Sequence, residues 1–159
     1  INTELVGEVR EYAGKLKNTD IREVLEVKLN SAGALLKGSP AVDLELLAPD
    51  GKTARLSDYK GKVIYVDLWA TWCGPCIQES PKFHELAKKY RNDNIVFLAV
   101  STDTEKKSWL SFIEGKEAGI PEYNCTDTKN LNEGWQIKYI PRFLLIGPSE
   151  AKSIPMSPT

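Results

Sequence analysis

Apolar residues recur at two different spacings along this chain, and the spacing predicts which elements form. From Ile1 to about Lys37 they recur at helical spacing, with a capping break at Asn18–Asp20, which predicts two helices. Gly38-Ser39-Pro40 then marks a boundary. Val42–Leu46 alternates apolar with acidic residues up to the turn Pro49-Asp50-Gly51, which predicts a β-hairpin.

The next apolar run, Val63–Trp69, is nearly continuous, as is typical of a central strand buried on both faces. Its one charged residue is Asp67. After Cys73 the apolar stripe becomes helical, and Pro81 is expected to kink or break that helix. Further along we expect strand 95–101, helix 104 to about 118, a short extended stretch around Tyr123, helix 129–137 and strand 142–146. Strands that alternate with helices predict an α/β layered domain.

The chain has 159 residues, enough for one compact core but short for two. We therefore expect a helical extension or linker at residues 1–37 and a single domain at residues 38–159. Its last stretch, 147–159, is rich in proline and has little apolar periodicity, so no helix is expected there.

Charge and composition exclude several classes of function. The formal net charge is −1, and the short basic clusters fall on expected exposed helix faces, so no nucleic-acid partner is predicted. No apolar run approaches the roughly 20 residues of a membrane span. The first residue is Ile1 rather than Met, which is compatible with a longer precursor carrying an export signal or a membrane tether outside the visible chain.

Three cysteines are too few for a disulfide scaffold, but Cys73 and Cys76 stand three apart where a strand leads into a helix. Unpaired amides and the positive end of the helix dipole stabilise the first sulfur as a thiolate, so Cys73 is the expected nucleophile. Cys76 lies one turn further and is placed to resolve a mixed disulfide. A carboxylate buried on the preceding strand has a raised pKa, which makes Asp67 the candidate proton acceptor.

The cysteines and the residues near them in sequence also allow other interpretations. A zinc site would need Cys125 and His84 as further ligands, and His84 lies two turns along the same helix, so no metal is predicted. His84 is expected on a solvated flank, and Cys125 is expected to be a small buried apolar residue. Two roles remain open for Glu79: it modulates the thiols, or its charge complements the positive end of the helix dipole.

The segment Val66–Cys76, with the sequence V-D-L-W-A-T-W-C-G-P-C, resembles the active-site segment of the thioredoxin-like superfamily. Pro81 and Tyr139–Phe143 resemble the helix proline and the cis-proline loop of that family. The hairpin and Leu56–Lys62 resemble its TlpA/ResA-like, AhpC/TSA-type branch. The family often carries a lysine near the buried carboxylate, and the strand 95–100 contains none.

The resemblance implies a thioredoxin-like fold with a central mixed β-sheet flanked by helices, an N-terminal β-hairpin and an apparently missing C-terminal helix. It implies a cis bond before Pro141. It also implies substrate-binding roles for a set of residues around the cysteines: Trp72, Gly74, Pro75, Ile140 and Pro141. Members of this branch act largely in the bacterial cell envelope or periplasm, some of them anchored to the membrane.

The predicted function is thiol–disulfide exchange without a cofactor, in which protein disulfides are reduced and an upstream thiol–disulfide donor returns the electrons. The first alternative is a redox-inert binding or assembly module of the same fold. The second is a peroxiredoxin-type peroxidase. The peroxidase motif wants Pro and Thr or Ser at positions that are Val66 and Ala70 here, which argues against it.

Overall fold

The computed structural model describes residues 43–91, 94–116, 119–135 and 137–147, the backbone of 39–40 and 152–156, and the single positions 11 and 15. The two helices predicted before residue 38 lie outside these described residues, apart from those two positions. The domain boundary near residue 38 therefore stays a prediction. Within the described residues, no helix combines the length and the apolar character that a membrane crossing requires.

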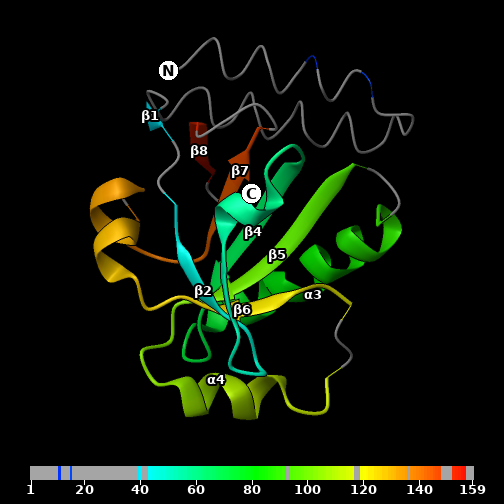
Figure 1. The fold of residues 1–159 in the computed structure, drawn as a ribbon. Coiled ribbons are helices and arrows are strands. Elements are labelled where there is room, and N and C mark those ends of the chain that lie inside the picture. Colours follow the sequence, from blue (N-terminus) through cyan, green and yellow to red (C-terminus); the bar gives the residue numbers. More distant parts are fainter. Residues whose placement is uncertain are drawn as a thin grey trace.

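Eight strands form one mixed sheet in the order β1-β8-β7-β4-β5-β6-β2-β3. Figure 1 shows β4 and β5 in the middle of this sheet, with α3 beside them. The elements in chain order are β1 (Ser39–Pro40), β2 (Glu45–Leu47), β3 (Thr53–Arg55), η1 (Leu56–Tyr59), β4 (Val63–Trp69), α3 (Gly74–Lys89), β5 (Ile95–Ser101), α4 (Lys106–Ile113), β6 (Glu122–Asn124), η2 (Asn130–Gly134), β7 (Arg142–Ile146) and β8 (Lys152–Met156). The predicted α/β class is confirmed, with a central mixed sheet flanked by helices and a β-hairpin of β2 and β3.

Strand β4 is the centre of the molecule, and all seven of its residues are buried. It pairs in parallel with β5 and antiparallel with β7. Because side chains alternate between the faces of a strand, Ile64, Val66 and Leu68 point to one face while Tyr65, Asp67 and Trp69 point to the other. This explains why the run is nearly continuously apolar in sequence.

The two faces of the sheet carry different cores. Ile64, Val66 and Leu68 join a large aliphatic cluster that also holds Leu131 from η2 and Trp135, which directly follows η2. On the other face Tyr65 packs against three aromatic rings, from α3, β5 and β7: Phe83, Phe97 and Phe143. Trp69, Ala99 and Trp109 continue this second core toward the cysteines.

Two predicted helices differ from the structure in their extent or type. The helix expected to reach about residue 118 ends at Ile113, because Gly115 has a φ of 74° and so adopts the left-handed conformation common at helix ends. The helix expected over 129–137 is instead a short π-helical turn, closed by a 3.0 Å bond from the Trp135 N–H to the Asn130 carbonyl. Helix α3 runs through Pro81 without a break.

Near the C-terminus the described backbone forms a strand rather than a helix. Strand β8 pairs antiparallel with β7, with Phe143 opposite Met156 and Ile146 opposite Ser153. Strand β1 then pairs with β8 at the edge of the sheet.

Leu98 tests how much the aliphatic core contributes to stability. It is fully buried in β5, so Leu98→Ala removes apolar contacts and leaves a cavity. We expect the free energy of unfolding to fall by about 2–5 kcal/mol in urea denaturation of the oxidised protein. The exposed Lys107→Ala should change it by only about 0.5 kcal/mol. A loss for Leu98→Ala no larger than that of this control would contradict the assignment of the core.

Candidate active site

Cys73 and Cys76 form a disulfide at the N-terminus of α3, with their Cα atoms 5.3 Å apart. Both side chains are buried, and they belong to the cluster that includes Trp69, Ala99 and Trp109. The pair thus lies directly beyond the carboxyl end of β4, where the central strand leads into the helix.

Cys73 is the N-cap of α3, and Pro75 occupies the first turn, where a missing N–H costs nothing. The backbone N–H of Cys76 donates to Sγ of Cys73 over 3.3 Å. An N-cap side chain normally accepts such a bond through oxygen, and here a sulfur takes the same position. In the reduced protein this donor and the helix dipole favour the thiolate form of Cys73.

The loop between β4 and α3 is fixed by Asp103, a buried residue just after β5. The backbone N–H of Thr71 donates to both Asp103 carboxylate oxygens, at 3.2 and 3.1 Å. The Thr71 hydroxyl donates to Oδ1 at 2.7 Å. These bonds hold the residues immediately before Cys73 against the end of β5. Asp103 is not among the site residues predicted from sequence, although a charged residue directly after a buried strand was a usable signal.

Asp67 is buried as predicted, with 1% of the residue exposed. Among the described residues neither of its carboxylate oxygens has a hydrogen-bond partner. Burial raises its pKa to about 7, and the nearby charge of Glu79 acts in the same direction. The carboxyl group therefore exchanges its proton close to neutral pH.

The two residues paired with Asp67 on the flanking strands carry no charge. Its partner on β5 is Ala99, and its partner on β7 is Phe143. β5 contains no lysine that could approach Asp67. Burial and the charge of Glu79 therefore set the pKa of Asp67. Glu79 is half-buried on α3, and its negative charge raises the pKa of Asp67.

The predicted substrate-binding residues surround the cysteines on the surface. Trp72 is 72% exposed, and Gly74 and Pro75 are exposed beside it. The Ile140–Pro141 bond is cis, and Ile140 packs against the cluster that contains both cysteines. The structure thus brings the loop before β7 to the N-terminus of α3, although these segments are far apart in sequence.

Two residues outside the predicted site occupy unexpected surroundings. His84 does not lie on a fully solvated flank: its side chain is 31% exposed, and its Nε2 lies 3.6 Å from Oε1 of Glu122. Glu122 is the first residue of β6, and burial raises its pKa to about 7. A three-residue strand has no readable periodicity, so sequence could not place this pair.

Cys125 is buried in the aliphatic core, as predicted, and burial raises its pKa to about 11. It lies in a different cluster from the disulfide. Among the described residues, no group of three or more His, Cys, Asp or Glu side chains is arranged to hold a metal ion.

Comparison with known proteins gives consistent matches. The model of the AhpC/TSA family matches residues 37–139. The thiol-disulfide oxidoreductase ResA of Geobacillus kaustophilus is 40% identical over 81 residues, which cover 51% of this chain and 47% of that protein. The chain therefore spans about half the length of this curated relative.

Solved structures give longer matches. A Bacteroides vulgatus protein assigned as a thiol-disulfide oxidoreductase is 56% identical with a TM-score of 0.66, covering 70% of this chain and 79% of that one. The exposed lipoprotein thioredoxin of Streptococcus pneumoniae is 30% identical with a TM-score of 0.63, covering 74% of this chain and 90% of that one.

The raised pKa of Asp67 predicts how stability depends on pH. Between its ordinary value near 4 and about 7, the folded protein holds a proton that the unfolded chain has released. The free energy of unfolding should therefore fall as pH rises through this window. Asp67→Asn should remove at most about 4 kcal/mol of that fall.

Urea denaturation of the oxidised protein at pH 5 and pH 8 measures this difference. The matched control is Glu85→Gln, which removes an exposed carboxylate from α3 and should leave the wild-type pH dependence. A pH dependence of the Asp67→Asn variant equal to that of the wild type would show that Asp67 does not titrate in this window.

Proposed function

Because this chain belongs to the AhpC/TSA family, in a TlpA/ResA-like branch with a thioredoxin fold, we propose that it reduces protein disulfides by thiol–disulfide exchange through Cys73 and Cys76. One observation carries the proposal. A cysteine pair caps the first turn of α3, with the Cys76 N–H bonded to the Cys73 sulfur. The strand before that helix, β4, carries the buried carboxyl group of Asp67, whose pKa burial raises to about 7.

In the first step the Cys73 thiolate of the reduced protein attacks one sulfur of the substrate disulfide. A bond forms between Cys73 and that sulfur, and the other substrate sulfur leaves as a thiolate that takes up a proton. The Cys76 N–H and the N-terminus of α3 stabilise the attacking thiolate. The loop bonds from Thr71 to Asp103 keep this sulfur at the helix end.

In the second step Cys76 resolves the mixed disulfide. Asp67 accepts the thiol proton of Cys76, and the resulting thiolate attacks Sγ of Cys73. The bond to the substrate breaks, the second substrate sulfur leaves as a thiol after protonation, and the Cys73–Cys76 disulfide forms. Two electrons have then moved from the protein to the substrate. A carboxyl group with a pKa of about 7 is suited to accept and return this proton.

The substrate is proposed to be an extended polypeptide held over the disulfide. The exposed Trp72 indole offers it an apolar contact, and Gly74 and Pro75 leave the approach to Cys73 open. The backbone of Ile140 and Pro141 is proposed to bind the substrate main chain, since that loop lies against the cysteine cluster.

After each cycle an upstream thiol–disulfide donor would reduce the Cys73–Cys76 pair again. We place this cycle outside the cytoplasm, in the bacterial cell envelope or periplasm, with a membrane tether outside the chain described here. One of its structural relatives is an exposed lipoprotein, which supports this location.

The two cysteines should have separable roles. Cys73→Ser removes the nucleophile and should abolish insulin reduction by dithiothreitol-recycled protein. Cys76→Ser keeps the nucleophile but cannot resolve the mixed disulfide, so a covalent adduct with the substrate should accumulate. Mass spectrometry of the intact protein detects that adduct.

Cys125→Ser is the matched control, because Cys125 lies in the aliphatic core, apart from the cluster that holds the disulfide. It should retain insulin reduction. Full activity of the Cys73→Ser variant would refute the proposed mechanism, and no activity of the wild type would favour a redox-inert binding module.

The direction of electron flow is tested by the midpoint potential of the Cys73–Cys76 pair. Equilibration in dithiothreitol or glutathione buffers, followed by counting of free thiols, measures it. We expect a value near that of thioredoxin, about −270 mV, which suits a reductase. A value near about −120 mV, like that of strong oxidants, would instead assign disulfide formation to this protein.

A further inference from the structure

We propose that Glu122 and Asp67 form a buried carboxyl pair, and that Glu122 passes the proton of Asp67 through His84 to the cleft between α3 and α4. This inference rests on the function proposed above and adds to it a route for the proton. Glu122 is thus a positioning residue for proton transfer, since it acts through Asp67 rather than on the sulfurs.

The sheet register places the two carboxylates on the same face. Asp67 on β4 pairs with Ala99 on β5, and Ala99 pairs with Glu122 on β6. Directly paired residues of neighbouring strands point to the same side, and the strands are about 4.8 Å apart. Only the methyl group of Ala99 lies between the two acidic side chains in this row.

Three of the four oxygens of the two carboxylates lack a hydrogen-bond partner among the described residues. Among the described residues, Oδ1 and Oδ2 of Asp67 and Oε2 of Glu122 are buried without a hydrogen bond. Buried oxygens are nearly always bonded, so three such acceptors in one region need an explanation. A proton held between the carboxylates, directly or through an ordered water over Ala99, satisfies them.

The electrostatics agree with this geometry. Burial raises the pKa of Glu122 to about 7, and the charge of Asp67 raises it further. Because the register places both groups in one row of the sheet, we expect them to titrate as a pair that holds a proton near neutral pH. A proton released by Cys76 to Asp67 then has a second carboxylate of matching affinity beside it.

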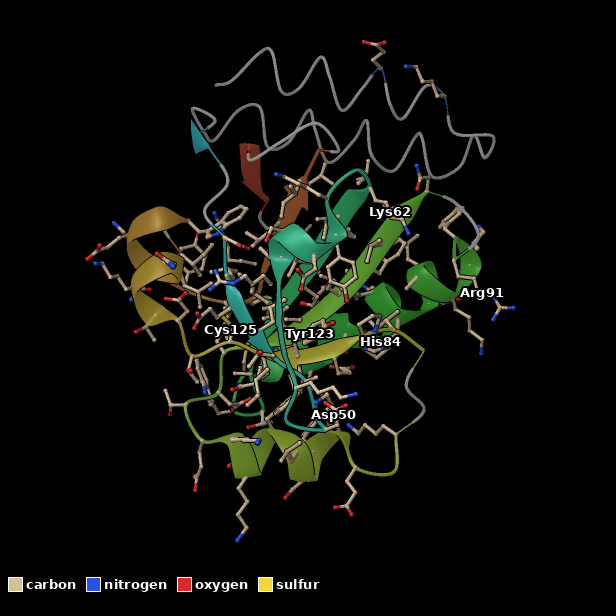
Figure 2. The ribbon with its side chains drawn as sticks, viewed as in Figure 1. Asp50, Lys62, His84, Arg91, Tyr123 and Cys125 are labelled. Atoms are coloured by element: carbon tan, nitrogen blue, oxygen red, sulfur yellow. A yellow bond between two sulfur atoms is a disulfide. The ribbon has the colours of Figure 1, made fainter. Side chains whose placement is uncertain are left out.

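His84 connects this pair to the solvent. Its Nε2 lies 3.6 Å from Oε1 of Glu122, and its side chain is more exposed than that of Glu122, at 31% against 13%. Figure 2 shows His84 extending from α3 beside β6. Both residues line a cleft of about 1060 Å³, whose wall also includes Trp69, Leu110 and Phe112.

The remaining charged groups around the pair come from each packed element. Glu79 on α3 raises the pKa of Asp67, and Lys116 after α4 lowers the pKa of Glu122. Burial and Lys116 lower the pKa of His84, which favours the neutral imidazole that can accept a proton. Tyr65 on β4 stays protonated, since burial and Asp67 raise its pKa.

The proton balance is simple. In the resolving step the Asp67 carboxylate gains the proton that Cys76 loses. That proton moves to the Glu122 carboxylate, then to the His84 imidazole, and finally to a buffer base in the cleft. Asp67 returns to its carboxylate form, and no electrons move along this route. When the disulfide is reduced again, protons enter by the same groups.

Glu122→Gln tests this route, because it removes the charge while keeping the shape of the side chain. Infrared difference titration of the oxidised protein should show two coupled carboxyl groups in the wild type. In the Glu122→Gln variant only the Asp67 carboxyl group of the pair should remain. Its pKa should be lower than in the wild type, because the neighbouring negative charge of Glu122 is gone. Asp67→Asn identifies the Asp67 signal. The matched control is Glu114→Gln, an exposed carboxylate at the same cleft, which should titrate like the wild type.

Stopped-flow release of substrate thiol by the reduced protein gives the kinetic outcome. We expect Glu122→Gln to slow resolution about tenfold near pH 7, and added imidazole to restore much of the rate. His84→Gln should also slow resolution while leaving the two carboxyl groups coupled, which separates the outlet from the pair.

An unchanged Asp67 titration in Glu122→Gln would overturn the inference, as would a rate loss that imidazole does not restore. A wild type that lacks disulfide exchange but shows coupled carboxyl groups would refute the proposed function and retain the pair. A wild type that reduces disulfides but has uncoupled carboxyl groups would retain the proposed function and refute the pair.

Discussion

Among the described residues the carboxyl group of Asp67 has no hydrogen-bond partner, and its burial in the central strand favours the protonated, uncharged form. The fold accepts this cost because the rest of β4 is apolar and packs on both faces. Val66 and Leu68 carry the aliphatic core on the opposite side. Stability and proton chemistry are thus divided between the two faces of one strand.

The second requirement is that the sulfur atoms stay at the end of that strand. Helix α3 begins at the cysteine pair, so its first unpaired amides surround Cys73. Asp103 binds the Thr71 backbone and so ties the loop to β5. Strands β4 and β5 are paired along seven residues, which makes this anchor rigid. Cys73 is therefore positioned by the sheet as much as by its own helix.

Much of this arrangement could be predicted from sequence because it is local. The periodicity of Val63–Trp69 indicated its burial, and the spacing of the cysteines indicated a helix N-terminus. The predicted end of the helix after β5, at about residue 118, was wrong because a single residue, Gly115, ends α4 early. The contact between His84 and Glu122 could not be read locally, since it arises only when α3 packs across β6. Pairing of β8 with β7 likewise depends on a partner that the proline-rich stretch does not reveal.

The outermost strands of the sheet, β1 and β3, have only two and three residues. Long open edges expose rows of unpaired amides and carbonyls that recruit foreign strands and seed aggregation. On β3 the exposed Arg55 is also held by Glu45 and Asp43, which places charge on that edge. Such short and charged edges present few backbone groups with which another extended polypeptide could form a lasting β-sheet.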